Sequence, residues 1–75
     1  NSNHDSPKVF LDSSVVISAV LSDKGGSFRL FNEAQNKYII LYISDFVLEE
    51  VVGILKLKYF SKLSIFENLL LIMFI

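Results

Sequence analysis

The sequence predicts a single α/β domain in which helices cover both faces of a parallel sheet, a three-layer arrangement. Two short apolar runs, residues 9–11 and 38–43, have the composition of buried strands. Each run is followed at once by polar residues and then by an apolar segment with helical spacing. The resulting order is strand, helix, helix, strand, helix, helix, in which a right-handed helical crossover joins two parallel strands.

The first strand is expected at residues 9–11, and Ser13 or Ser14 is expected to cap the helix that follows. A serine at this position can accept a hydrogen bond from a backbone N–H in the first helical turn. The apolar residues of this helix are Val16, Ile17, Val20 and Leu21. The glycine pair at 25 and 26 ends it, since glycine tolerates the left-handed conformation past a helix end. Ser27 then predicts the cap of a second helix that runs to about residue 37.

The second strand is expected at residues 38–43, which are rich in β-branched and aromatic side chains. Ser44 predicts the cap of a third helix from residue 45 to about residue 58. An acid in the first turn, such as Asp45, is favoured by the helix dipole. The apolar stripe of this helix is Val47, Leu48, Val51, Ile54 and Leu55. Ser64 and Glu67 have the spacing of a capping box, which predicts the start of a fourth helix.

The composition is rich in apolar residues for so short a chain. Of 75 residues, 52% are hydrophobic. A chain of this length buries only about 60% of its unfolded surface, so we expect it either to be part of a larger core or to associate. The net charge of -1 provides no overall field that would attract nucleic acid. There is no cysteine, which excludes a disulfide framework and a thiolate metal site.

The two ends of the chain differ in character. Residues 1–7 are polar, are not a signal peptide, and are expected to form a flexible leader ahead of a domain at residues 8–75. Residues 69–75 are all apolar. Seven residues are too few to span a bilayer, which needs about 20. Because no later segment could bury this helix, we expect that the sequence stops inside a domain and that the helix pairs with another copy.

Asp12 and Glu50 are the candidate site residues. Asp12 follows the first strand directly, and Glu50 lies two turns into the helix after the second strand. Neighbouring parallel strands place both at the sheet edge where α/β proteins bind ligands. Two carboxylates there suit Mg²⁺ or Mn²⁺, which prefer oxygen ligands. The plainer alternative is that Asp12 only caps a helix and that Glu50 is solvated.

Other chemistries for an aspartate at a strand end fit the neighbouring residues poorly. A phosphatase of the haloacid-dehalogenase type needs a second Asp two positions on, where this chain has Ser14. The glycine pair at 25 and 26 lacks the Gly-Lys-Ser/Thr of a phosphate-binding loop. The single histidine, His4, lies in the leader, which argues against a Ser-His-Asp system. A receiver-like or phosphatase-like domain stays open as a third hypothesis.

Residues 9–21, an apolar strand followed by Asp, two serines and an apolar helix, resemble the opening of a PIN domain. The resemblance continues through residues 25–31 and through residues 43–51, where Ser44 and Glu50 fit the family's second motif. It covers roughly residues 8 to 72. The most similar variety is the toxins of toxin–antitoxin systems. The resemblance implies the N-terminal half of a PIN-like three-layer sandwich, ordered β-α-α-β-α-α.

The resemblance also implies a function, a Mg²⁺- or Mn²⁺-dependent endoribonuclease that cuts single-stranded RNA in the cytoplasm, with an antitoxin protein as a possible partner. It implies that Asp12 and Glu50 are the catalytic, metal-binding acids, that Glu49 is the rival of Glu50, and that Ser14 supports the site by hydrogen bonding. The family's further acids come from later elements. We therefore expect this chain to be inactive or weakly active as given.

The competing hypothesis is a non-catalytic module that uses its sheet edge and its apolar C-terminal helix to self-associate or to bind an antitoxin-like protein. Lysines at 56, 58 and 62 surround Tyr59 and Phe60 and could contact RNA through charge and stacking. A solvated helix end with two core aromatics is the preferred interpretation of that cluster.

Overall fold

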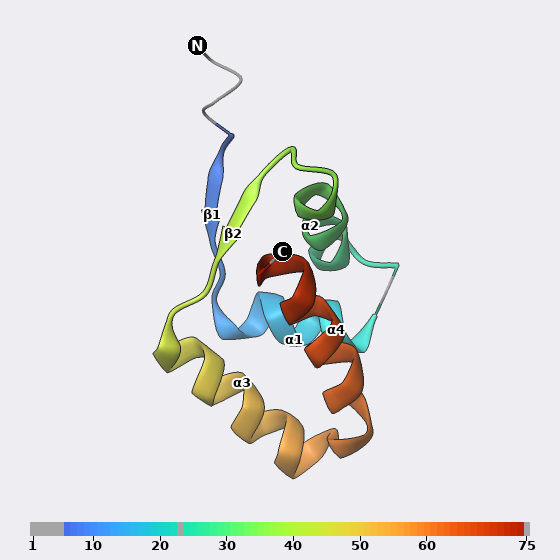
Figure 1. Cartoon of the computed structure of the whole chain (residues 1–75). Helices are drawn as coiled ribbons and strands as arrows, with labels where there is room; N and C mark the ends of the chain where they lie inside the picture. The colour runs from blue at the N-terminus through green and yellow to red at the C-terminus, as the bar shows by residue number, and fades with distance from the viewer. Residues whose placement is uncertain (1–5, 23, 75) are drawn as a thin grey trace.

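Two short parallel strands and four α-helices make up the part of the chain that the structure describes (Figure 1). The computed structural model describes residues 6–22 and 24–74. Its elements are β1 (Lys8–Phe10), α1 (Ser13–Leu21), α2 (Gly26–Gln35), β2 (Ile40–Tyr42), α3 (Asp45–Lys58), the 3₁₀ turn η2 (Phe60–Lys62) and α4 (Leu63–Phe74). The predicted leader at residues 1–7 lies mostly outside the described residues. The carbonyl of Pro7 accepts a hydrogen bond of 2.8 Å from the amide of Ile40.

The predicted fold class, a PIN-like three-layer α/β sandwich, is wrong. The fold is mostly helical, at 70%, and its sheet has two strands of three residues each. Both strands are shorter than the apolar runs that predicted them. A sheet of this size cannot separate two layers of helices, so the helices pack mainly on one another.

The described residues cover only one face of the sheet. Val9 pairs with Leu41 across the strands, and Leu41 is buried in the core. The pair of Phe10 and Tyr42 points to the opposite face, where Phe10 is 78% exposed. Their rings stack with centroids 5.2 Å apart. The continuous apolar run in β1 suggested cover on both faces, but one of its residues lies on an open face.

The predicted caps of the first two helices differ from the structure. The cap of α1 is Asp12, whose carboxylate accepts a hydrogen bond from the amide of Val15, so neither Ser13 nor Ser14 has that role. Ser27 lies inside α2, which begins after Gly25. A carboxylate at the N-cap is as favourable as a serine hydroxyl, which is why residue type alone did not decide the position.

The third helix agrees with its prediction. Ser44 caps α3 by accepting a hydrogen bond of 3.1 Å from the amide of Val47. The chain then turns through η2 directly into α4, which begins at Leu63 and therefore contains Ser64. The predicted capping box at Ser64 is wrong, because the preceding turn already has helical geometry at Leu63.

Helix α2 ends at a residue with left-handed backbone geometry. Lys37 has φ of 69°, a conformation that favours glycine. The amide of Lys37 bonds to the carbonyl of Ala34, and the amide of Tyr38 bonds to that of Glu33. This is the Schellman pattern of a helix end, with a lysine in the position that glycine usually occupies. It turns the chain from α2 into β2.

The core lies where the helices meet the inner face of the sheet. Its buried residues are Leu11, Val16, Ala19, Val20, Phe31, Leu41, Val51, Leu55, Phe66 and Leu69. Helix α4 packs against α1, α2, α3 and β2. The expectation that nothing in this chain could bury the apolar C-terminal segment is therefore wrong for α4, although Leu71 is 58% exposed. None of the helices in the described residues has the length and apolarity needed to cross a membrane.

Candidate functional site

The candidate site lies at one corner of the fold, where β1 leads into α1 and β2 leads into α3 (Figure 1). The strands are parallel, so both helices begin at the same end of the sheet. The hydroxyl of Ser13, the first residue of α1, donates a hydrogen bond to Oε1 of Glu50 in the second turn of α3. This contact brings Glu50 to the corner that Asp12 occupies.

Asp12 is held in place by its own helix. Its Oδ1 accepts hydrogen bonds of 3.0 Å from the amide of Val15 and of 3.0 Å from the hydroxyl of Ser14. These donors, the Val15 amide first, lower the pKa of Asp12 below its ordinary value because they stabilise the ionised form. The side chain is exposed, so the carboxylate is charged at neutral pH and open to solvent.

Ser14 donates its hydroxyl to Asp12, a contact that is compatible with the supporting role that the PIN resemblance implies for it. The alternative that Asp12 caps a helix is also correct, since the same oxygen receives the amide of Val15. The alternative that Glu50 is simply solvated is incomplete, because Ser13 holds its carboxylate. That bond distinguishes Glu50 from Glu49 as the acid held at this corner.

Whether these residues fit a divalent cation depends on the number of acids. Asp12 and Glu50 are exposed carboxylates at one corner and offer the oxygen ligands that Mg²⁺ and Mn²⁺ prefer. Within residues 6–22 and 24–74, no three His, Cys, Asp or Glu side chains gather closely enough to hold a metal. Mg²⁺ usually keeps several waters, so two carboxylates can bind it, although weakly.

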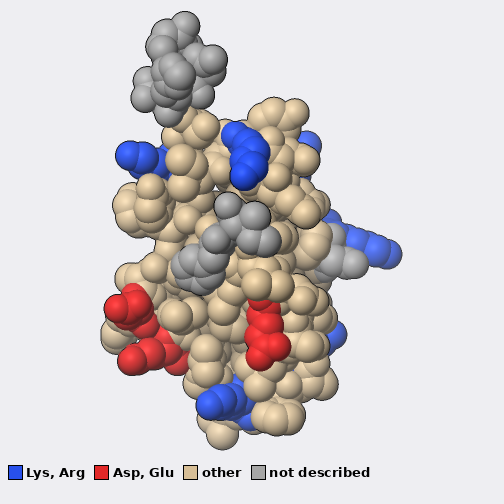
Figure 2. All heavy atoms as spheres, in the orientation of Figure 1, with Lys and Arg blue, Asp and Glu red and all other residues tan. Residues whose placement is uncertain are grey.

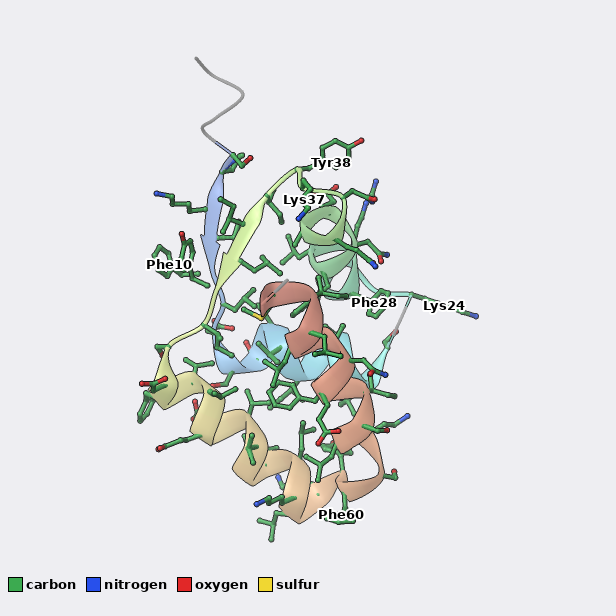
Figure 3. The ribbon with its side chains drawn as sticks, in the orientation of Figure 1. Phe10, Lys24, Phe28, Lys37, Tyr38 and Phe60 are labelled. Atoms are coloured by element: carbon green, nitrogen blue, oxygen red, sulfur yellow. The ribbon has the colours of Figure 1, made fainter. Side chains whose placement is uncertain are left out.

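An aromatic pair beside this corner was missed at the sequence level. Lys8, Phe10 and Asp12 are alternate residues, and Lys8 and Phe10 are both exposed on the open face of β1. Figure 3 shows the Phe10 side chain pointing away from the sheet, and its ring stacks on Tyr42. The alternation of residues 8, 10 and 12 indicates that these residues share one face of the strand. The apolar run at residues 9–11 favoured a strand buried on both faces instead.

Charge is distributed unevenly over the surface. Figure 2 shows acidic side chains in the lower half of this face, at its left and near its centre, and cations at the top, the right and the bottom. The lysine cluster around Tyr59 and Phe60 lies at the far end of α3 from the candidate site. Phe60 is 71% exposed, so the interpretation of two core aromatics there is wrong.

Comparison with protein-family models, with curated protein sequences and with solved structures finds no match for this chain. The resemblance to PIN domains therefore stays a prediction from sequence.

Proposed function

We propose that this chain carries part of a metal-dependent endoribonuclease site of the kind that the PIN resemblance implies, at the corner of Asp12 and Glu50. The observation that supports the proposal is the hydrogen bond from Ser13 to Glu50, which joins two helix starts that are far apart in the sequence. The structural role of Asp12 as a cap is compatible with this function, because only one of its two oxygens is used by Val15 and Ser14.

Each residue has a distinct role in this proposal. Asp12 and Glu50 hold the cation through carboxylate oxygens, while Ser14 orients Asp12 and Ser13 orients Glu50. A bound Mg²⁺ or Mn²⁺ supplies Lewis-acid activation of water and stabilises charge on the phosphodiester. With two acids the cation is bound weakly, so the chain as given is weakly active or inactive.

The aromatic pair favours a single-stranded substrate. Phe10 and Tyr42 are exposed beside the corner, and unpaired bases stack on such rings whatever their sequence. A base stacked on this pair places its backbone next to Asp12, which follows Phe10 closely in the chain. The site therefore fits single-stranded RNA better than a duplex, whose bases are not available for stacking. In this proposal the substrate is a cytoplasmic RNA.

Binding of Mn²⁺ tests the site directly. In ¹H–¹⁵N spectra of the chain, Mn²⁺ should broaden the amide signals of residues 12–14 and 49–51 first, with an affinity on the order of 1 mM. Asp12→Asn and Glu50→Gln should each weaken this broadening about tenfold, since each removes one charged ligand. Glu49→Gln is the matched control, because it removes an equal charge one residue away and should leave the affinity unchanged.

Cleavage of a labelled single-stranded RNA with Mn²⁺ is the second measurement. Any activity of the chain should disappear in Asp12→Asn and survive in Glu49→Gln. Phe10→Ala should weaken binding of the RNA, whereas Phe60→Ala, which removes an exposed aromatic at a distance, should not. Broadening centred on Glu49 and unchanged by Asp12→Asn would show that the proposal is wrong.

A further inference from the structure

We propose that the chain self-associates through the exposed face of α3, which packs antiparallel against α3 of a second copy. This inference does not depend on the ribonuclease proposal. It concerns the outer face of α3, defined by the exposed residues Asp45, Phe46, Glu49, Glu50, Gly53, Lys56, Leu57 and Lys58. In Figure 1 this helix runs along the edge of the molecule.

The centre of the outer face is apolar although it faces solvent. Phe46 is 74% exposed and Leu57 is 83% exposed. Phe46, Gly53 and Leu57 have the spacing that places residues on one side of a helix. The opposite side of α3 carries Val51 and Leu55, both fully buried in the core. Helix α3 therefore has a second apolar stripe that the chain itself leaves open.

Gly53 lies within that stripe and leaves room for another chain. A Cβ atom added at Gly53 would meet nothing within 4 Å, so the surface there is open. Glycine inside a helix costs about 1 kcal/mol relative to alanine. An approaching helix can come closer at a glycine than at any other residue, so this position suits a helix crossing.

The charges of the outer face select a second copy in antiparallel orientation. Its N-terminal half is acidic and its C-terminal half is basic, with Lys56 and Lys58 in the last turn. If Phe46 lies opposite Leu57 of the second copy, Glu49 lies on the same flank as Lys56 of that copy and within reach of it. A parallel arrangement would instead place like charges together, which is destabilising.

A second copy satisfies this pattern better than an unrelated partner does. In a two-fold interface the same patch serves both sides, so each complementary contact is made twice. The net charge of -1 adds little repulsion between copies. A helix of 14 residues is about 21 Å long, so the interface is small and the association is weak and dependent on concentration.

The first test is sedimentation equilibrium of the chain over a wide concentration range. The average mass should rise from 8.5 kDa toward twice that value as the concentration increases. Raising the salt concentration to about 1 M should lower the fraction of dimer, because screening weakens the charged contacts. A chain that stays at 8.5 kDa throughout would overturn the proposal.

A charge exchange is the decisive test of the orientation. Lys56→Glu should abolish self-association, and so should Glu49→Lys. Mixing these two variants should restore a dimer, because each then presents charge opposite to the other. Lys24→Glu changes the charge equally on an exposed residue of another region and should leave association unchanged.

Two outcomes would contradict the proposal even if dimers form. The first is a mixture of the two variants that stays monomeric while circular dichroism shows both to be folded. The second is a dimer that is lost in Leu71→Asp and kept in Lys56→Glu, which would place the interface on the apolar C-terminal helix.

Discussion

The hydroxyl of Ser13 donates a hydrogen bond to the carboxylate of Glu50, 37 residues further along the chain. The bond joins the first turn of α1 to the second turn of α3, two helices that also pack on each other. It is a side-chain contact between partly exposed groups, so its effect on stability is modest. Its effect on geometry is larger, because it fixes which acid of α3 lies beside Ser13, the residue that follows Asp12.

A double-mutant cycle on Ser13 and Glu50 measures this contact. Ser13→Ala and Glu50→Ala should show a coupling of about 0.5–1 kcal/mol in urea unfolding, the net value of one hydrogen bond that remains partly in water. The cycle with Glu49→Ala in place of Glu50→Ala should show no coupling. Equal coupling in the two cycles would mean that the bond has no specific role.

Asp12 stabilises α1 in its ionised form, so stability should depend on pH. Hydrogen bonds from Val15 and Ser14 lower the pKa of Asp12 in the folded chain below the ordinary value that it has in the unfolded chain. This contribution is complete above the unfolded pKa and is lost as the pH falls through the lower, folded pKa. Urea unfolding from pH 7 to pH 2 should show it, together with contributions from other acids.

Two substitutions at Asp12 separate the cap from the charge. At pH 7, Asp12→Asn should change the free energy of unfolding little, because asparagine is also a good N-cap. Asp12→Ala should lower it by about 1 kcal/mol, because alanine cannot cap the helix. The stability difference between the native chain and Asp12→Asn should disappear at low pH. If both substitutions were equally harmless at pH 7, the cap would have no energetic role.

The sequence predicts the helices of this fold better than it predicts the sheet. The third helix was placed correctly from Ser44 and the stripe that contains Val51, because burial and capping there agree. The number of layers could not be obtained in this way. Phe10 is as apolar as a core residue, and only the position of the other elements decides that its face of the sheet stays open.

The candidate site was predictable to a similar degree. Topology placed Asp12 and Glu50 at the same end of two parallel strands, and the structure puts them at one corner. The contact that brings Glu50 there comes from Ser13, which the sequence suggested only as a cap. A serine at the first position of a helix has no periodic signal that would distinguish a cap from a donor to a distant helix.

Glycine at position 37 should make the chain more stable than lysine does. Its φ of 69° is unfavourable for a residue with a Cβ atom, and glycine adopts it without strain. Lys37→Gly should therefore raise the free energy of unfolding by roughly 0.5–1 kcal/mol. Asn36→Gly, at the neighbouring exposed position where φ is -87°, is the control and should not be stabilising. A loss of stability in Lys37→Gly would contradict the assignment of this helix end.

Two leucines of α3 should respond in opposite ways to truncation. Leu55 is fully buried, so Leu55→Ala should cost about 2–5 kcal/mol, a large part of the stability of so small a chain. Leu57 is 83% exposed, and Leu57→Ala should change the stability of the monomer by less than about 0.5 kcal/mol. Both are measured by urea unfolding of dilute chains. Equal losses would mean that α3 is rotated relative to the core.

Gly53→Ala separates the stability of one copy from its association with another. Alanine is the better helix former, and a Cβ atom at this position meets nothing within 4 Å, so the monomer should gain about 0.5–1 kcal/mol. In the proposed dimer the same methyl group lies where two α3 helices cross. Gly53→Ala should therefore weaken association in sedimentation while it strengthens folding in dilute urea unfolding. If Gly53 lay outside the interface, Gly53→Ala would raise the free energy of unfolding and leave the association unchanged. A gain in folding stability together with a loss of association requires that a second copy uses the open surface at Gly53.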